Sequence, residues 1–251
     1  MADALGFRFT WHGHACVELE SPGGRTILID PWMGNPKSAK SADQVDRCDV
    51  LLVTHGHFDH IGGSAGSTTD VDAVTIARRT KPAWPGIHEL SLWLDNTADH
   101  DSEVVGMNAG GTVDARGVEV TMVPAVHSAG DWSASTSTGL YLGDPVGFVI
   151  ELENGRRVYH AGDTDVFGDM ALIRELHRPD VVFLPIGGHF TMGPKGAAKA
   201  VQLLGVGTVI PIHYGTFPIL AGTPDQLRAE LAALGLANVI VLSPEPGQWV
   251  E

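Results

Sequence analysis

The fold of this chain is decided by the stretch Thr54-His55-Gly56-His57-Phe58-Asp59-His60-Ile61-Gly62-Gly63. It directly follows Val50-Leu51-Leu52-Val53, an apolar run of strand length that predicts a strand buried on both faces. His55 and His57 are two residues apart, so their imidazoles project to the same side of an extended backbone. Together with Asp59 and His60 they can hold one metal ion, or two ions close together. The competing interpretation, a histidine-rich surface loop, explains any single histidine here better than it explains the whole spacing.

A metal ion needs further ligands, and the sequence offers four candidates at the ends of other strand-like runs. His127 ends the run 118–126, Asp163 follows a predicted hairpin, His189 follows the run 181–188 and His213 follows the run 208–212. An α/β sheet places its chemistry at such strand ends. Taken one at a time, each candidate is equally well explained as a structural histidine or a turn aspartate. Their shared position favours the interpretation that they act as a set.

Hydrophobic patterning predicts a layered α/β architecture. The first half reads as short strands over 7–10, 15–20, 26–29, 50–53 and 118–126, with short helices over 71–79 and 89–94. Asn154-Gly155 lies between the runs 148–152 and 156–159 and predicts a β-hairpin. Later, helices over 167–177, 194–204 and 225–234 alternate with strands over 181–185, 208–212 and 239–242. This order favours two sheets packed face to face with helices outside, in a single domain over 1–251.

Composition narrows the class of protein. The 251 residues are 43% hydrophobic and 18% charged, which is typical of a globular chain and excludes general disorder. Because 16 Lys+Arg stand against 30 Asp+Glu, the net charge is −14, and nucleic acid and anionic membrane surfaces are poor partners. No apolar run approaches the ~18 residues of a membrane span, and the opening residues lack a secretory signal, so we expect a cytoplasmic protein. Two cysteines cannot build a disulfide framework, whereas 12 histidines are a large supply of metal ligands.

Several segments together resemble the metallo-β-lactamase superfamily. The H-x-H-x-D-H stretch, His127, Gly162-Asp163-Thr164 and His213 follow the order of its motifs. The resemblance is closest to a branch of small metal-dependent hydrolases, related to the L-ascorbate-6-phosphate lactonases and more distantly to the N-acyl-phosphatidylethanolamine phospholipases. Supporting segments include Gly13-His14-Ala15-Cys16, Ile27-Leu28-Ile29-Asp30-Pro31 and His213-Tyr214-Gly215-Thr216-Phe217. The resemblance implies a four-layered αβ/βα sandwich of two mixed β-sheets, the metallo-β-lactamase fold.

The same resemblance implies a dinuclear metal centre. It assigns one ion to His55, His57 and His127, a second ion to Asp59, His60 and His213, and a bridging carboxylate to Asp163. Imidazoles and carboxylates suit Zn²⁺, which we expect first, and also Mn²⁺ or Fe²⁺. The di-iron flavoproteins of the superfamily typically carry a glutamate where this chain has His57, which favours hydrolysis over redox chemistry.

Two residues are candidates for roles in catalysis beyond simple ligation. The family implies that a water bridging the two cations loses a proton and attacks, while Asp59 orients it and carries a proton to the leaving group; pure ligation by Asp59 is the alternative. His189 stands where the branch more often has the second residue of an Asp-Asn pair. It would bind substrate, donate to a developing oxyanion, or only fill the wall of the site.

Residues around the ligands are expected to support them. Asp30 ends a strand and His14 lies in a Gly-flanked turn, so both are candidates to fix ligand imidazoles, with turn capping as the alternative. The segment 128–145, which includes Trp132 and Tyr141, follows a proposed ligand and would form a mobile rim over the site or a plain solvent-covered loop.

We therefore expect a metal-dependent hydrolase that uses a metal-bridging hydroxide to cleave a small ester, lactone, amide or phosphodiester. The alternative is a non-hydrolytic metal-binding sensor or redox protein on the same fold. The expected partner is a small-molecule substrate, with no nucleic acid and no membrane, and a homo-oligomer is possible.

Overall fold

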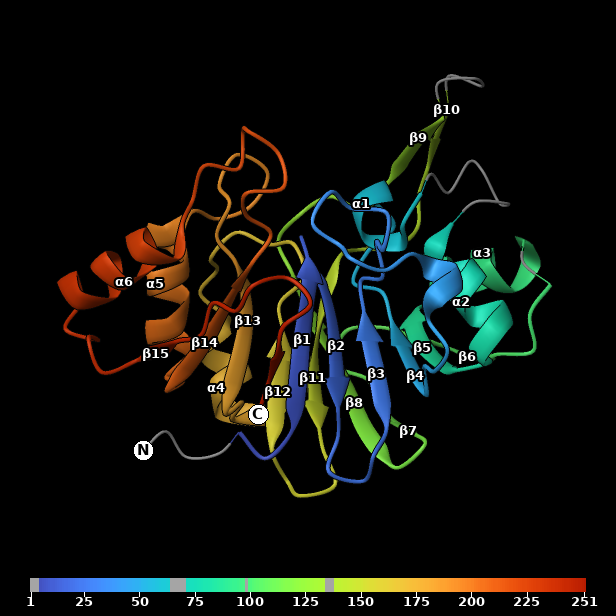
Figure 1. Cartoon of the computed structure of the whole chain (residues 1–251), viewed down its shortest axis with the longest axis horizontal. Helices are drawn as coiled ribbons and strands as arrows, with labels where there is room; N and C mark the ends of the chain where they lie inside the picture. The colour runs from blue at the N-terminus through green and yellow to red at the C-terminus, as the bar shows by residue number, and fades with distance from the viewer. Residues whose placement is uncertain (1–4, 64–70, 98, 134–137) are drawn as a thin grey trace.

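The computed structural model describes residues 5–63, 71–97, 99–133 and 138–251, and it has the predicted layered architecture. Two seven-stranded mixed sheets lie face to face, and helices cover their outer faces (Figure 1). The predicted fold class is therefore confirmed. No helix within the described residues is long and apolar enough to cross a bilayer.

The first sheet is built mainly from the N-terminal half of the chain. Its order is β16-β1-β2-β3-β4-β5-β6, with neighbours antiparallel from β16 to β3 and parallel from β3 to β6. The strands are β1 (Arg8–Gly13), β2 (Cys16–Glu20), β3 (Thr26–Ile29), β4 (Val50–Leu52), β5 (Ala83–Ile87), β6 (Glu103–Met107) and β16 (Trp249–Val250). The last strand comes from the C-terminus and pairs Val250 with Phe9, so both ends of the chain join one sheet.

The second sheet repeats this plan with later residues. Its order is β15-β14-β13-β12-β11-β8-β7, parallel from β15 to β12 and antiparallel from β12 to β7. The strands are β7 (Thr112–Ala115), β8 (Val118–Pro124), β11 (Val146–Glu151), β12 (Arg157–His160), β13 (Val181–Pro185), β14 (Thr208–Ile212) and β15 (Ile240–Val241). The hairpin predicted at Asn154-Gly155 joins β11 to β12.

Helices pack on the outside of each sheet. The first sheet is covered by α2 (Asp72–Thr80) and α3 (His88–Thr97), and the second by α4 (Met170–His177), α5 (Pro194–Leu204) and α6 (Pro224–Ala233) (Figure 1). A short α1 (Phe58–Ile61) lies at one end of the sandwich, and a 3-10 turn, η1 (Ala42–Gln44), precedes β4. The alanines of α5 are small enough to bring that helix close to the sheet, where they join a buried cluster with β12, β13 and β14.

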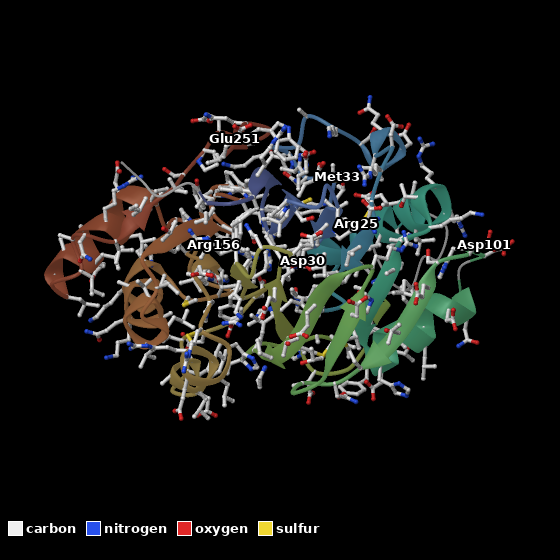
Figure 2. All side chains as sticks on the ribbon, turned by 90° about the horizontal axis from the view of Figure 1, so that it is seen from below. Arg25, Asp30, Met33, Asp101, Arg156 and Glu251 are labelled. Carbon is white, nitrogen blue, oxygen red and sulfur yellow. The ribbon has the colours of Figure 1, made fainter. Side chains whose placement is uncertain are left out.

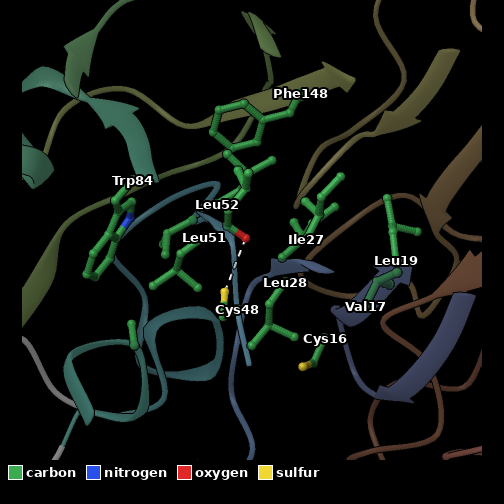
Figure 3. Close-up of a cluster of buried hydrophobic side chains, with 14 of the residues drawn as sticks. Cys16, Val17, Leu19, Ile27, Leu28, Cys48, Leu51, Leu52, Trp84 and Phe148 are labelled. Atoms are coloured by element: carbon green, nitrogen blue, oxygen red, sulfur yellow. Dashed lines mark hydrogen bonds between the residues drawn. The ribbon is translucent and has the colours of Figure 1, made fainter. Parts of the chain in front are cut away.

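The main core fills the space between the two sheets. Apolar residues of β1 to β5 meet those of β8 and β11 to β14, as in the packing around Leu52 and Phe148 (Figure 3). Cys16 and Cys48 are free thiols buried in this core. Figure 2 shows Asp30 near the middle of the molecule, whereas Asp101 lies at its edge. A fully buried carboxylate in such a core requires hydrogen-bond partners, and it marks the position of the site.

The structure agrees with the sequence expectations in several strands and differs from them in a few other elements. Strands 26–29, 181–185 and 208–212 lie where they were predicted. The strand β5 was missed because its Pro85-Gly86 pair is typical of a turn, yet all five residues are buried between β4 and β6. The segment 128–145 is not a plain loop, because it contains an antiparallel pair, β9 (Asp131–Ser133) and β10 (Thr138–Leu140). Residues 134–137 and the side chain of Trp132 lie outside the described residues.

Candidate metal centre

The predicted ligands meet at the end of the sandwich where α1 lies. The strand β4 ends at Leu52, and α1 begins at Phe58 with His57 as its N-cap residue. The helix ends after one turn at Gly62, whose φ of 77° is the left-handed conformation that glycine adopts without strain. His55 and His57 therefore lie between the strand and the helix, and His60 lies within the helix.

Three histidines form one ligand group. His55, His57 and His127 have ring centroids 4.4, 5.1 and 5.2 Å apart, and their ligand atoms all lie within 4.8 Å of one another. His127 is brought there by the loop after β8. The Val126 N–H donates to Thr164 Oγ1 at 2.9 Å, and Val126 accepts from the Asp165 N–H at 3.0 Å. These bonds connect the loop that carries His127 to the loop that carries Asp163.

A second group lies beside the first. Its ligand atoms, also within 4.8 Å of one another, come from His14, Asp59, His60 and His213. Its three predicted members, Asp59, His60 and His213, are joined here by His14, which the sequence suggested only as a supporting residue. The His213 N–H donates to the His14 carbonyl at 2.7 Å, so the end of β14 is hydrogen-bonded to the turn after β1 in the other sheet.

Asp163 lies between the two groups. Its Oδ2 is 3.0 Å from His213 Nε2, 3.3 Å from His60 Nε2 and 3.6 Å from His127 Nε2. The residue before it must be glycine, because a Cβ on Gly162 would lie 2.7 Å from the Thr54 Cβ and the backbone has a φ of 61°. Burial would raise the pKa of the Asp163 carboxyl, but His213 and His60 hold it well below its usual range. The carboxylate is therefore ionised and faces three imidazole nitrogens.

The donor set fits divalent cations. Within the described residues, the buried atoms His60 Nε2, His213 Nε2 and Asp163 Oδ1 have no hydrogen-bond partner, although burying an unpaired polar atom costs about 1–3 kcal/mol. These atoms belong to residues that converge on one point. Neutral imidazoles with one or two carboxylates are the ligands that Zn²⁺, Mn²⁺ and Fe²⁺ accept. A metal ion bound among these residues would satisfy these atoms.

Asp30 orients two of the candidate ligands. The Asp30 carboxylate, which is fully buried, accepts hydrogen bonds from the Thr54 N–H, the Thr54 hydroxyl and His60 Nδ1, each at 2.8 Å. Because Nδ1 of His60 donates to it, Nε2 is the nitrogen of that ring left to bind a metal ion. The Thr54 hydroxyl lies 3.1 Å from His55 Nδ1, so the same carboxylate orients His55 through Thr54. The prediction that Asp30 fixes a ligand imidazole is confirmed for His60.

His14 contacts a carboxylate, whereas the sequence predicted that it would contact the imidazole of a ligand. Its Nε2 lies 3.0 Å from Asp59 Oδ2, and its Nδ1 lies 3.0 Å from Thr216 Oγ1. Burial lowers the pKa of His14 to about 4, so the ring is neutral near neutral pH, donating from Nε2 and accepting from the Thr216 hydroxyl. Burial would raise the pKa of Asp59, but the hydrogen bond from His14 lowers it to about 2. Asp59 is therefore held as an ionised carboxylate.

The backbone is strained at several of these positions. His14, Asp30, His189 and His213 have φ values of 52°, 48°, 60° and 55°, in the left-handed region that non-glycine residues seldom adopt. Such strain is concentrated at functional sites, where surrounding contacts over-determine the conformation. His14, Asp30 and His213 directly follow β1, β3 and β14, and His189 lies in the loop after β13, so the strained positions are where the chain leaves the ends of the strands.

A cavity of about 570 Å³ opens over the ligands. It is lined by the ligand residues His57, Asp59, His127 and Asp163, by Ser128, and by three phenylalanines that the sequence reading did not single out: Phe58, Phe190 and Phe217. Within the described chain, His189 is not one of the lining residues; its ring packs edge-to-face on Phe190, with centroids 4.5 Å apart. Tyr141 is exposed and donates its hydroxyl to Asp144 at 3.0 Å. Phe58 and Phe190 could have been found as bulky apolar residues next to candidate histidines.

Comparisons with known proteins agree with this geometry. Residues 25–214 match the family model described as Beta-lactamase superfamily domain. A UPF0173 metal-dependent hydrolase of Myxococcus xanthus is 48% identical over 95% of this chain and 81% of its own length, and one of Methanopyrus kandleri is 47% identical over 97% and 99%. The solved structure of Igni18, a novel metallo hydrolase from the archaeon Ignicoccus hospitalis, has a TM-score of 0.81 and 35% identity and covers 97% of both chains.

A more distant solved structure shares the fold alone. CmlA, a diiron beta-hydroxylase from Streptomyces venezuelae, is 18% identical with a TM-score of 0.68, covering 98% of this chain and 54% of its own. The fold by itself is therefore compatible with more than one metal chemistry, and the residues of the site must decide between them.

Proposed function

Because this chain is a metal-dependent hydrolase of the family described as Beta-lactamase superfamily domain, we propose that it cleaves a small ester, lactone, amide or phosphodiester at a centre of two divalent ions. One ion would be held by His55, His57 and His127, the other by Asp59, His60 and His213, with Asp163 shared between them. Zn²⁺ is our first expectation, and Mn²⁺ and Fe²⁺ suit the same donors.

The observation that carries this proposal is the surroundings of Asp163 Oδ2. Nitrogen atoms of three imidazoles from three different elements lie within 3.0–3.6 Å of it, and two of those nitrogens are otherwise unpartnered. Without metal ions, burying these unpaired nitrogen atoms would only destabilise the fold. Because these ligands come from both sheets, we also propose that the whole chain acts as one unit.

The cations would lower the pKa of a shared water and polarise the oxygen of the scissile bond. The residues of the chain do the rest. Asp30 and Thr54 hold the His60 and His55 rings in one tautomer, which keeps the Nε2 lone pairs directed into the site. His14 holds Asp59, which lines the cavity and can take up a proton at its free carboxylate oxygen and pass it to the leaving group.

Hydrolysis is favoured over a redox role by the first ligand group. That group consists of three neutral imidazoles, His55, His57 and His127, with no carboxylate of its own. Three imidazoles with an open position are one donor set of catalytic zinc sites that activate water. A sensor on the same fold would use the same donors but would turn over no ester.

The test combines metal analysis with a hydrolase panel. We expect close to two ions per chain by elemental analysis, and turnover on a panel of lactones, aryl esters and bis-p-nitrophenyl phosphate. The variants His55→Ala and Asp163→Ala should each lose metal and lower kcat/KM by at least about a hundredfold. His177→Ala, which changes a histidine of α4 that belongs to none of the candidate ligand groups, is the matched control. Less than one ion per chain, or full activity in the two ligand variants, would overturn the proposal.

A further inference from the structure

The cavity over the ligands has an aromatic wall that the proposed chemistry does not require. Phe58 begins α1, Phe190 lies in the loop after β13 and Phe217 lies in the loop after β14, and all three line the cavity. Phe58 is 51% exposed and Phe190 is 55% exposed. Three large apolar side chains from three segments, left open around a cavity, indicate a binding surface more than a packing accident.

Neighbouring rings pack against the three phenylalanines and fix their positions. The Trp32 ring packs edge-to-face on Phe58 at 5.7 Å and stacks on Phe217 at 5.9 Å. His189 supports Phe190 from its own side at 4.5 Å. Aromatic pairs at these separations contribute to fixing ring positions. The surface is therefore preformed, and ordering it on binding costs little.

The charges around the cavity argue against an anionic group on this wall. Within the described residues, no lysine or arginine lines the cavity. Lys37, from the loop that follows Trp32, has its Nζ 5.4 Å from the ring centroids of Trp11 and Tyr214 and lines a different hollow with them. An anion placed against the phenylalanines, away from the proposed metal ions, would lose hydration without gaining a countercharge.

We propose that the substrate carries a neutral, apolar group, an alkyl chain or an aromatic ring, next to its scissile bond, and that Phe58, Phe190 and Phe217 bind this group while the ligand residues hold the metal ions. The inference rests on the proposed function, since it names the substrate class of the same site. It disfavours phosphorylated sugar lactones, whose polar and charged groups would face the aromatic wall. It also gives His189 a role in supporting Phe190, which differs from the three roles that the sequence left open.

Binding can be tested without turnover. N-phenyl-1-naphthylamine, a neutral probe that fluoresces in apolar surroundings, should bind the metal-loaded protein saturably and be displaced by p-nitrophenyl hexanoate. Phe190→Ala and Phe217→Ala should weaken probe binding at least about fivefold, whereas Phe190→Leu, which keeps an apolar side chain, should restore most of it. Leu176→Ala, which removes an exposed apolar side chain on α4, is the matched control. Metal analysis and circular dichroism of each variant show whether it has kept its ions and fold.

Hydrolysis supplies the second measurement. Wild-type kcat/KM should be at least about tenfold higher for p-nitrophenyl hexanoate than for the acetate, since a buried methylene contributes up to about fourfold. Mono-p-nitrophenyl adipate, which ends its chain of the same length in a carboxylate, should lose that advantage. Equal rates on all three esters, or an unchanged hexanoate preference in folded, metal-loaded Phe190→Ala and Phe217→Ala, would overturn the inference and leave the proposed function intact. Probe binding that depends on the phenylalanines, with no ester, lactone, amide or phosphodiester cleaved, would support the wall and overturn the function.

Discussion

Replacing Asp30 with asparagine changes the support of the candidate centre with almost no change in shape. The Asp30 carboxylate accepts three hydrogen bonds at 2.8 Å, with Oδ1 receiving the Thr54 N–H and Oδ2 receiving both the Thr54 hydroxyl and His60 Nδ1. Its φ of 48° is also tolerated by asparagine, so the backbone should not move. Any effect of Asp30→Asn therefore comes from the loss of one acceptor oxygen and of the negative charge.

The geometry allows two orientations of the new amide, and both are unfavourable. If the amide oxygen takes the place of Oδ2, the NH₂ group faces the Thr54 N–H and leaves a buried donor unpaired. If it takes the place of Oδ1, the NH₂ group faces His60, whose Nδ1 must then accept, and the proton moves to Nε2, the atom that faces Asp163. Either outcome costs about 1.5–3 kcal/mol in lost charge-assisted hydrogen bonds. Disturbed ligand orientation of this kind typically weakens metal binding about 10–100-fold.

The assay is competition for metal against a chromophoric chelator, with thermal unfolding of the metal-free protein measured in parallel. Asp49→Asn is the matched control, because Asp49 Oδ2 accepts the Thr26 N–H at 2.9 Å near the opposite end of the same pair of strands, β3 and β4. We expect Asp30→Asn to weaken metal binding and Asp49→Asn to leave it unchanged. Equal metal affinity in wild type and Asp30→Asn, or equal losses in both variants, would refute the reasoning.

Three further predictions concern metal removal, the thiols and one glycine. Removing the ions with dipicolinate should abolish turnover and lower Tm by about 8–16 °C per ion, since an ion present at a thousand times its Kd stabilises the fold by about 4 kcal/mol. Re-addition of Zn²⁺ should reverse both changes. An unchanged Tm would contradict a contribution of the ions to the stability of the fold. Burial raises the pKa of the Cys16 and Cys48 thiols, so Ellman's reagent should react slowly with the native protein and rapidly with both thiols in guanidinium chloride. A fast reaction of the native protein with the reagent would show that the core is open. Gly162→Ala should destabilise the fold by about 1–3 kcal/mol more than Gly155→Ala in urea unfolding. Both glycines have positive φ, but a Cβ at 162 would collide with Thr54 whereas a Cβ at 155 meets open space. Equal losses of stability would show that the Thr54 side chain moves aside at no cost.

Much of the fold follows from local pattern. The runs 26–29, 181–185 and 208–212 are apolar, short and bounded by turn residues, and each is a strand in the structure. β5 could not be predicted in this way, because Pro85 and Gly86 favour a turn in isolation and are kept extended only by pairing with Val105 and Gly106 of β6. The pair β9 and β10 was missed for a related reason: each strand is only three residues long, so neither shows a periodic hydrophobic pattern, and only their pairing with each other defines them.

The ligand candidates divide in the same way. The sequence by itself predicted that His55, His57, Asp59 and His60 lie close together after the buried strand, because their separations along the chain are short. The one-turn helix that carries Asp59 and His60 came from the structure. Only the tertiary structure decided that His14 contacts Asp59 and Thr216, which are 45 and 202 residues away, and that three histidines surround one oxygen of Asp163.

The aromatic wall also belongs to the tertiary structure. Phe58, Phe190 and Phe217 come from segments that the order of the two sheets brings to one edge, and His189 lies behind that wall because its strained turn directs the ring onto Phe190. Such contacts depend on strand order and on side-chain rotamers in a packed core. These are set by all neighbours at once, so no local stretch of sequence can specify them.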